Sequence, residues 1–278
     1  MAWKKAYHAN CWGPLGGNAV GVTSITQLTY RTFGDMEKAI TEIAEAGYTG
    51  TELFDGNLLD YEDRLKDLTR VLNRSGVKLV GAYSGGNFIF DDILGEELAR
   101  IERAARAAAA VGAEHLVVGG GAKRAGGTKR DDIKRLAAAL EKVVRIAKKH
   151  GLRAHYHPHL TTIVEGPKEV RKVFKETSID FCPDTAHLAA GGGDVPEMIR
   201  DHRARISYVH LKGWQKDPFA FTPLDRGTLD MNAIVKALRD IDFSGWITAE
   251  LDSWPDPKEG AVRSMEFLHK AEANHHKK

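Results

Sequence analysis

The sequence of 278 residues has few cysteines and no long apolar run. Its two cysteines, Cys11 and Cys182, lack the CxxC spacing of a zinc ribbon, and they indicate no disulfide framework. No window approaches the roughly 18 apolar residues that a membrane span needs, and the start MAWKKAYHANCW lacks the apolar core of a signal peptide. We therefore expect a cytoplasmic protein that does not enter a membrane.

The chain also lacks a charge imbalance and the common phosphate-binding and hydrolase motifs. Its 40 basic and 38 acidic residues give a net charge of +2, which indicates no affinity for nucleic acid. The Gly-rich segment VVGGGAKRAGGTKR contains neither GxxxxGK[ST] nor GxGxxG, and the chain has no GxSxG. We therefore expect no nucleic-acid partner, and we interpret Lys123 and Arg124 as part of a solvated loop.

What the chain does contain is a regular alternation of strand and helix patterns. Apolar alternation predicts strands at residues 5–12, 48–54, 78–84, 115–121, 152–159, 179–187, 206–212 and 245–251. Amphipathic segments, several of them closed by glycine, predict helices at residues 34–46, 60–74, 95–111, 129–150, 167–175, 195–203, 230–240 and 258–273. Eight strand and helix units in this length are typical of a (β/α)8 barrel, an α/β fold, whereas an open doubly wound sheet has fewer strands.

We expect a single barrel domain over residues 1–278, because no linker or break in composition divides the chain. Residues 13–29 form the longest insertion of the first half and are a candidate mobile cover over the mouth of the barrel. Residues 272–278 are a candidate disordered tail.

Polar side chains gather late in the predicted strands, at the end of such a barrel that carries the active site. Alternation along a strand puts every second side chain on one face. The residues that share a face in this way are His155, His157 and His159; Cys182 and Asp184; Tyr208, His210 and Lys212; Thr248, Glu250 and Asp252; and His8, Asn10 and Trp12.

Four of these residues on adjacent strands predict a divalent metal site: His157, Asp184, His210 and Glu250. Imidazole nitrogen and carboxylate oxygen suit Mn²⁺, our first choice, and also Co²⁺, Fe²⁺ or Zn²⁺. A cation also offsets the cost of burying Asp184 and Glu250 close together. A single inward-facing histidine is commonly a hydrogen-bonded core residue, and an aspartate before a helix is commonly its N-cap. The gathering of four such residues favours the metal.

Other residues receive roles around this predicted metal site. His155 lies two residues before His157 on the predicted strand and therefore deeper in the barrel, so we interpret it as structural support. His159 and His187 are candidates for substrate contact or proton transfer, and Lys212 for proton donation. The predicted substrate-binding residues are His8, Asn10, Trp12, Glu52, Asn87, Trp214 and Arg226.

Segments along most of the chain resemble the xylose isomerase-like superfamily of sugar isomerases, epimerases and dehydratases. They are EIAEAGYTGTELF, LNRSGVKLVGAYS, PDTAHLAAGGGD, YVHLKGW, FTPLDRGTLDMNAIVKAL and GWITAELD. The resemblance implies a metal-dependent TIM barrel in which Asp184, His210 and Glu250 are metal ligands. It places His157 where most sugar epimerases and isomerases of the superfamily carry a glutamate that is both ligand and acid/base. The change argues against symmetric two-base epimerisation.

The segment HYHPHLTTIVE resembles the His-rich fifth strand of inosose dehydratases, and PLDRG resembles their PLGEG loop with Arg226 in place of an acidic residue. The resemblance implies a lyase that acts on a keto-cyclitol or keto-sugar, 3-keto-glycosides included. A metal would stabilise the enolate, and Glu250, His159 or His187 would remove the α-proton.

Alternatives to a lyase stay open at this point. The first is a ketose 3-epimerase or aldose-ketose isomerase of the same superfamily. An abasic-site endonuclease of the superfamily is disfavoured, because the third and fourth strands lack the further histidines of its zinc site and the net charge is near neutral. A further alternative is a non-catalytic barrel that binds a metal or a sugar. The chain is also a candidate homo-oligomer or subunit of an enzyme complex.

Overall fold

The computed structural model describes residues 3–16 and 28–273. Eight parallel strands form a nearly closed barrel in the order β8-β7-β6-β5-β4-β1-β12-β9. An isolated parallel bridge between Asp184 and His210 brings the two outer strands together, with His210 N donating to Pro183 O at 3.0 Å. The strands are β1 Lys4–His8, β4 Gly50–Phe54, β5 Lys78–Gly86, β6 His115–Gly120, β7 Arg153–His157, β8 Asp180–Phe181, β9 Tyr208–Leu211 and β12 Trp246–Ala249. The predicted (β/α)8 barrel is confirmed.

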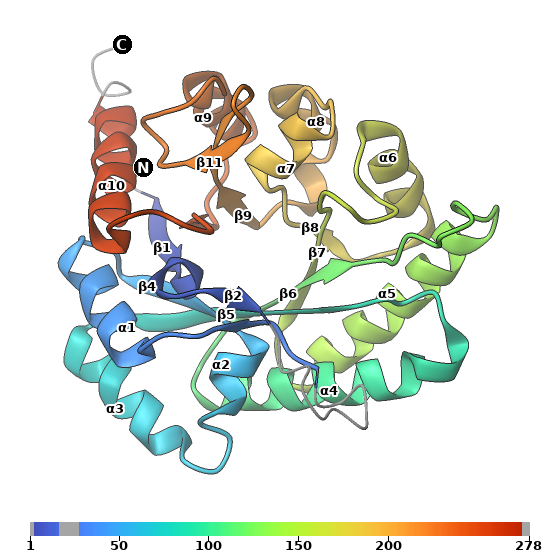
Figure 1. Cartoon of the computed structure of the whole chain (residues 1–278), viewed down its shortest axis with the longest axis horizontal. Helices are drawn as coiled ribbons and strands as arrows, with labels where there is room; N and C mark the ends of the chain where they lie inside the picture. The colour runs from blue at the N-terminus through green and yellow to red at the C-terminus, as the bar shows by residue number, and fades with distance from the viewer. Residues whose placement is uncertain (1–2, 17–27, 274–278) are drawn as a thin grey trace.

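Helices surround the strands on the outside of the barrel (Figure 1). Several begin where an aspartate side chain accepts a hydrogen bond from the backbone two or three residues into the helix, as Asp35, Asp194 and Asp230 do. The helix before β5 ends at Ser75, and Gly76 after it takes a left-handed φ of 69° that glycine adopts without strain. The helices are α1 Met36–Glu45, α2 Asp55–Leu59, α3 Leu65–Ser75, α4 Asp91–Ala110, α5 Asp132–Lys149, α6 Pro167–Glu176, α7 Thr185–Ala190, α8 Val195–Asp201, α9 Met231–Asp240 and α10 Pro257–Ala273.

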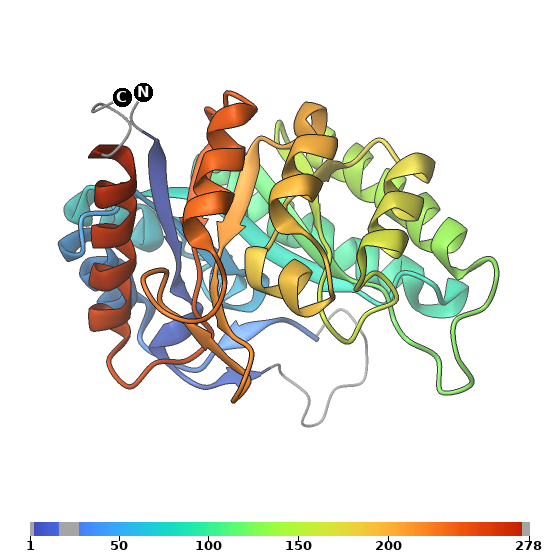
Figure 2. The ribbon, with the colours of Figure 1, turned by 90° about the horizontal axis from the view of Figure 1, so that it is seen from above.

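The last helix returns to the first strand. Helix α10 runs beside β1 in Figures 1 and 2. Glu272 accepts hydrogen bonds from Trp3 N and Lys5 Nζ, both at 2.8 Å. Residues 272 and 273 belong to α10, within the helix predicted at 258–273, and the rest of the predicted tail, residues 274–278, lies outside the described residues.

Two predicted strands give way to a helical turn before their predicted ends, and both changes affect the site. The strand predicted at 5–12 ends at His8, and a 3₁₀ turn Ala9–Trp12 follows, so alternation does not place Asn10 and Trp12. The strand predicted at 179–187 gives way to helix α7 at Thr185, because the Asp184 side chain accepts a hydrogen bond from His187 N at 2.8 Å and caps that helix.

Short hairpins lie beyond two of the strands and were not predicted. Strands β2 Leu15–Gly16 and β3 Arg31–Thr32 pair after β1, and strands β10 Gly213–Gln215 and β11 Ala220–Thr222 pair after β9. In Figure 2 the connections that follow the strands gather at one end of the barrel, away from the start of β1. The predicted cover at 13–29 falls mostly on residues 17–27, which lie outside the described residues.

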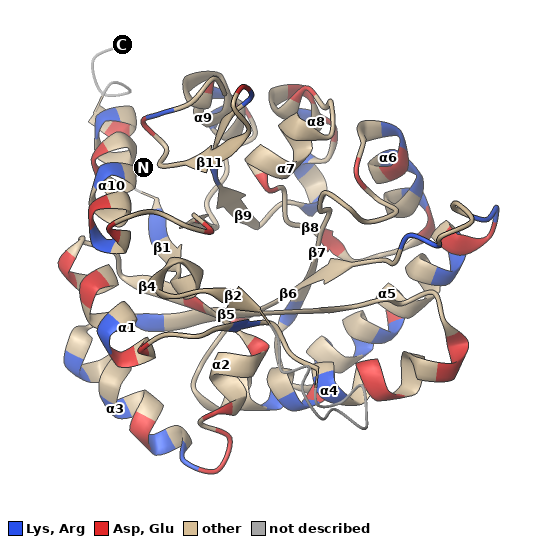
Figure 3. Ribbon diagram, in the orientation of Figure 1, with Lys and Arg blue, Asp and Glu red and all other residues tan. Residues whose placement is uncertain are grey.

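The core has two parts. The larger packs the outward faces of the strands against the helices, and the smaller lies inside the barrel and consists of Ala6, Phe54, Val80, Tyr83, Val117, Cys182, Tyr208 and Trp246. Charged residues lie mainly on the helices and loops, and the strands carry few (Figure 3). The few ionisable groups that the barrel encloses are therefore conspicuous, and most of them belong to the site described next.

Candidate metal centre and substrate pocket

The four predicted metal ligands come together at the C-terminal end of the barrel. His157 ends β7, Asp184 follows β8, His210 lies in β9 and Glu250 follows β12. Each is buried and offers one ligand atom, and these atoms all lie within 4.8 Å of one another. We call these four residues the His/Asp/His/Glu cluster.

The cluster contains polar atoms that the protein itself leaves without a hydrogen bond. Both ring nitrogens of His157 and His210, Asp184 Oδ2 and Glu250 Oε2 are buried and make no hydrogen bond of good geometry within the described residues, although these groups lie close together: His157 Nε2 is 3.4 Å from Asp184 Oδ2, and His210 Nδ1 is 2.6 Å from Glu250 Oε2. Buried polar atoms are costly when unpaired, and nearly all in native proteins have a partner. A divalent cation held by imidazole nitrogens and carboxylate oxygens would satisfy these atoms, so the residues present fit the implied metal.

Charges inside the barrel keep the two carboxylates of the cluster ionised. Burial opposes their ionisation, but Lys212 and His210 hold the pKa of Glu250 well below its ordinary value. The Lys212 ammonium likewise lowers the pKa of Asp184 against the effect of burial, and His187 adds to this only when it is protonated. Both carboxylates are therefore available as ligands at neutral pH.

His210 lies between two carboxylates. Its Nδ1 is 2.6 Å from Glu250 Oε2, and its Nε2 is 3.0 Å from Glu52 Oε1. Burial lowers the pKa of His210, but these two carboxylates raise it to about 10. A metal would replace one proton, because a ligating imidazole must be neutral on the nitrogen that binds. The other nitrogen would then donate to Glu52, the usual arrangement behind a metal-bound histidine.

Glu52 and His8 lie on the inner side of the cluster. Both are buried, and His8 Nε2 is 3.4 Å from Glu52 Oε1. Burial lowers the pKa of His8 to about 4, which makes it neutral at pH 7. Neither side chain lines the pocket described below. The structure thus brings these two predicted substrate-binding residues to the cluster, in contact with its members.

Lys212 and Asn10 connect Glu250 to Asp252. Lys212 Nζ donates to Glu250 Oε1 at 3.0 Å and to Asp252 Oδ1 at 2.7 Å. Asn10 Nδ2 donates to the same two atoms, at 3.2 Å and 3.0 Å respectively. The Lys212 ammonium also lies 4.4 Å from the centre of the Phe221 ring. Asp252 was not among the predicted site residues, although its position two residues after Glu250 placed it on the same strand face.

His159 and His187 lie next to each other beside the cluster. Their ring centres are 3.7 Å apart, and each ring lies within 6 Å of the His157 ring, at 5.8 Å and 5.6 Å. His159 follows the end of β7, and His187 belongs to α7. Burial lowers the pKa of both imidazoles, so both are neutral at neutral pH and able to accept a proton.

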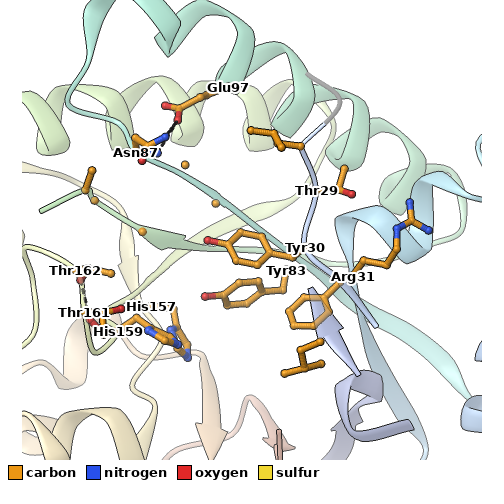
Figure 4. A pocket seen from close by; sticks show the side chains of 18 of the residues that line it. Thr29, Tyr30, Arg31, Tyr83, Asn87, Glu97, His157, His159, Thr161 and Thr162 are labelled. Carbon is orange, nitrogen blue, oxygen red and sulfur yellow. Dashed lines mark hydrogen bonds between the residues drawn. The ribbon is translucent and has the colours of Figure 1, made fainter. Parts of the chain in front are cut away.

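A cavity of about 670 Å³ opens beside the cluster. Predicted site residues that line it are Asn87, His157, His159 and Glu250. Figure 4 shows Asn87 at one end and His157 and His159 at the other. The sequence argument missed Tyr30, Phe54, Tyr83, Glu97 and Arg100, which also line it. Phe54 and Tyr83 lie late in predicted strands, so their positions in the sequence could have identified them. Glu97 and Arg100 lie on a helix and Tyr30 follows an insertion, so no strand pattern pointed to these three.

Three predicted substrate-binding residues lie elsewhere among the described residues. Trp12 donates its indole N–H to Glu42 of α1 at 2.6 Å, on the outer side of β1. Trp214 packs against Phe219 in the hairpin β10–β11, with ring centres 6.2 Å apart. Arg226 is exposed and lies 5.8 Å from the Trp254 ring. None of the three lines the cavity.

Comparisons with known proteins agree with this architecture. The family model described as xylose isomerase-like TIM barrel matches residues 40–271. An inosose dehydratase from Geobacillus kaustophilus is 27% identical over 256 residues, which cover 79% of this chain and 80% of that protein. An inosose dehydratase from Clostridium perfringens is 26% identical over 267 residues, with 84% and 88% covered.

Solved structures share the fold at lower identity. An L-ribulose 3-epimerase gives a TM-score of 0.75 at 18% identity and covers 99% of this chain and 97% of its own. A 3-keto-D-glucoside 4-epimerase from E. coli gives a TM-score of 0.71 at 17% identity, with 96% and 99% covered. At such identities these likenesses concern the fold alone.

Proposed function

The chain belongs to the xylose isomerase-like TIM-barrel family, and from this premise we propose that it is a metal-dependent carbon–oxygen lyase acting on a keto-cyclitol or keto-sugar. The observation that carries the proposal is the His/Asp/His/Glu cluster, whose buried ligand atoms make no hydrogen bond of good geometry and lie beside a cavity that a small molecule can enter. The names of the matched relatives, inosose dehydratases, support a dehydratase and a sugar-like small molecule as substrate.

The metal would be held by His157, Asp184, His210 and Glu250, with Mn²⁺ as our first choice. When bound, it supplies positive charge that polarises the substrate ketone and lowers the pKa of the α-proton. The residues of the chain then determine where the substrate lies and where the proton goes.

We assign His159 as the base that removes the α-proton. It is the one member of the His159–His187 pair that lines the cavity, and its imidazole is neutral because burial lowers its pKa. The carbon–hydrogen bond breaks, a carbon–carbon double bond forms, and the bond to the β-oxygen breaks. The imidazolium of His159 returns the proton to the departing oxygen, so that water leaves and no oxidant is needed.

Lys212 and Asn10 act on the carboxylates in this proposal. Lys212 is buried behind Glu250 and Asp252, and it bonds to both. Its charge keeps Glu250 ionised. His187 is buried, with its ring tilted against that of His159 and the ring centres 3.7 Å apart; it keeps the base in place and does not line the cavity.

His157 favours elimination over epimerisation in this account. The resemblance to sugar epimerases places a glutamate at this position, where it serves as one of two bases on opposite sides of the substrate. An imidazole that binds a cation has no free lone pair on the ligating nitrogen and offers no second base there.

The proposal is tested by turnover of 2-keto-myo-inositol with the Mn²⁺-loaded protein, followed by the ultraviolet absorbance of the conjugated product. We expect turnover that chelation abolishes. Changing a residue that only contacts a metal ligand costs up to about 100-fold, so Glu250→Gln, which changes a ligand itself, should lower turnover by more than that. Glu266→Gln, on the exposed side of α10, is the matched control and should keep full activity. Interconversion of ketoses without a conjugated product would instead identify an epimerase.

A further inference from the structure

The loop of residues 158–165 follows β7 and carries His159 to the cavity, and we call it the His159 loop. Within it, His159 Nδ1 lies 2.6 Å from the backbone oxygen of Leu160. A carbonyl oxygen only accepts hydrogen bonds, so Nδ1 donates and carries the proton of the neutral imidazole. The lone pair that can accept a proton is therefore on Nε2, and the position of the Leu160 carbonyl determines this.

The peptide unit between Leu160 and Thr161 connects His159 to a carboxylate. Its carbonyl accepts from His159 Nδ1, and its N–H, on Thr161, donates to Glu165 Oε1 at 3.0 Å. A peptide unit is planar, so a bond that fixes the direction of the N–H also fixes the direction of the carbonyl. Hydrogen bonds in such a chain also polarise one another. Glu165 thus orients the His159 ring through one peptide unit.

Thr161 has a backbone conformation that needs support. Its φ is 68°, in the left-handed region, where a β-branched residue is rarely found. Such a conformation persists only where the surrounding structure holds it. Glu165 supplies the bond at Thr161 itself, and Thr162 Oγ1 donates to His159 O at 2.7 Å; Figure 4 shows both threonines beside His159. Without Glu165, we expect Thr161 to relax to a negative φ and turn the preceding carbonyl away from His159.

Glu165 is itself held from two sides. Its Oε2 is bonded to Lys123 Nζ, in the loop that follows β6, and a Cβ atom added to Gly191 after α7 would lie only 2.1 Å from Glu165 O. Burial opposes ionisation, but the hydrogen bonds from Lys123 and Thr161 N hold the pKa of Glu165 below its ordinary value. The side chains of Lys123 and Glu165 are 48% and 33% exposed, so we expect their ion pair to contribute less than the bond to Thr161 N.

We propose that Glu165 is a positioning residue for His159, which acts through the intervening peptide to keep the proton on Nδ1 and the lone pair of Nε2 free. Lys123 holds Glu165 in place. This rests on the proposed function, in which His159 removes the α-proton. The carboxylate of a catalytic triad sets the tautomer of its histidine in the same way, but by direct contact. Neither Glu165 nor Lys123 lines the cavity beside the cluster, so neither contacts the substrate there.

Nitrogen-15 NMR of the full chain labelled at histidine tests the tautomer without substrate, at pH 8 and with Zn²⁺, which is diamagnetic. The signals of His159, identified by their loss in His159→Gln, should show the Nδ1–H form in the wild-type chain. Glu165→Ala should raise the ratio of the Nε2–H to the Nδ1–H form at least about tenfold. Glu165→Gln keeps an oxygen acceptor for Thr161 N, so it should stay within about threefold of wild type. Glu176→Ala, at an exposed position on α6, is the control.

Hydrogen exchange of the Thr161 amide measures the support of the loop in the same proteins. Its hydrogen should exchange at least about tenfold faster in Glu165→Ala than in the wild-type chain, because the bond to Oε1 is lost. The exchange rate in Glu165→Gln and in Glu176→Ala should stay close to that of wild type.

Steady-state kinetics of the Mn²⁺-loaded full chain with 2-keto-myo-inositol measure the consequence for turnover. Glu165→Ala should lower kcat at least about tenfold and change KM by no more than about twofold, because the substrate keeps its contacts. Lys123→Ala should lower kcat only about two- to fivefold, since its ion pair is exposed, and Lys123→Arg should restore it. Lys129→Ala, at an exposed position in the same loop, is the matched control.

The tautomer separates this proposal from the proposed function. A His159 that stays in the Nδ1–H form in Glu165→Ala would overturn the positioning role, whatever the turnover. Equal tautomer changes in Glu165→Ala and Glu165→Gln would contradict the route through the Thr161 N–H. The predicted changes in tautomer and exchange without turnover by the wild-type chain would support the positioning role and contradict the lyase.

Discussion

Three histidines of one short segment occupy different depths of the barrel and have different partners. His155 lies deepest, with Nε2 2.9 Å from His115 Nδ1, below the cluster. His157 belongs to the cluster, and His159 reaches the cavity. Alternation along the strand brings the first two to one face, and the chain leaves the strand after His157. Depth in the barrel therefore separates support, metal binding and substrate contact.

His115 supplies a test of the buried histidine pair through the pH dependence of stability. Burial lowers its pKa from 6.5 to about 4, so the unfolded chain binds more protons between these values. The free energy of unfolding should therefore fall as pH drops below about 6.5, by about 2 kcal/mol at pH 5 from this group alone. Urea unfolding at pH 7 and pH 5 should show a smaller loss for His115→Gln than for wild type. His269→Gln, at an exposed position, should keep the wild-type loss; equal losses in all three proteins would contradict the assignment.

The site residues that could be predicted from the sequence are those that lie at or just after the end of a predicted strand. The four ligands end four parallel strands, and parallel strands bring their C-terminal ends to one rim, so spacing alone assembled them. Trp12 could not be placed because the chain turns into a 3₁₀ segment after His8. Arg100 and Glu97 were missed because they lie on a helix, where a charged residue ordinarily faces water.

At the scale of elements, helix α4 is tied to the ends of β4 and β5 by a buried ion pair. Arg100 reaches from α4 to Asp55 at the start of α2, and Ser84 Oγ of β5 donates to Asp55 Oδ2 at 2.6 Å. The Asp55 carboxylate also accepts from Tyr30 N at 2.8 Å, which fixes a residue that lines the cavity. One pair thus connects a helix, two strands and a pocket residue.

Removing Arg100 should therefore be costly. Arg100→Met leaves the Asp55 carboxylate buried without its cation, and we expect the free energy of unfolding in urea to fall by about 3–5 kcal/mol. Arg106→Met, on the same helix with an exposed pair to Glu62, should cost at most about 1 kcal/mol. Similar small losses for both variants would show that the buried pair does not hold α4 in place.

Element types were predicted better than element ends. The eight strands and the main helices followed from periodicity, because each buries one continuous apolar face. The prediction of a strand through His187 was wrong because the Asp184 side chain accepts a hydrogen bond from His187 N and caps a helix there, in place of extended backbone. This cap involves only a few residues, so it leaves the pattern of apolar residues unchanged. The hairpins after β1 and β9 pair only a few residues each, so no periodic signal marked them.

At the scale of the whole molecule, charged residues on the surface and buried ionisable groups inside the barrel occupy different places. The described helices include none that is long and apolar enough to cross a membrane. Some of the ionisable groups on the outside form exposed ion pairs, and most of the buried ones inside the barrel lie toward the C-terminal end of the strands. Gathering two histidines and two carboxylates there without a cation would leave their buried ligand atoms without hydrogen bonds of good geometry. Binding of one divalent ion per chain is the central claim.

Titration of the chelator-treated chain with Mn²⁺, by calorimetry together with thermal unfolding, tests that claim most directly and needs no substrate. We predict one ion per chain and a stabilisation of about 2.7 kcal/mol when free Mn²⁺ is 100 times its Kd. Both effects should be lost in His157→Gln and in Asp184→Asn, and kept in the exposed control His269→Gln. Absence of Mn²⁺, Co²⁺, Fe²⁺ and Zn²⁺ binding to the wild-type chain, or unchanged binding in His157→Gln, would contradict the account.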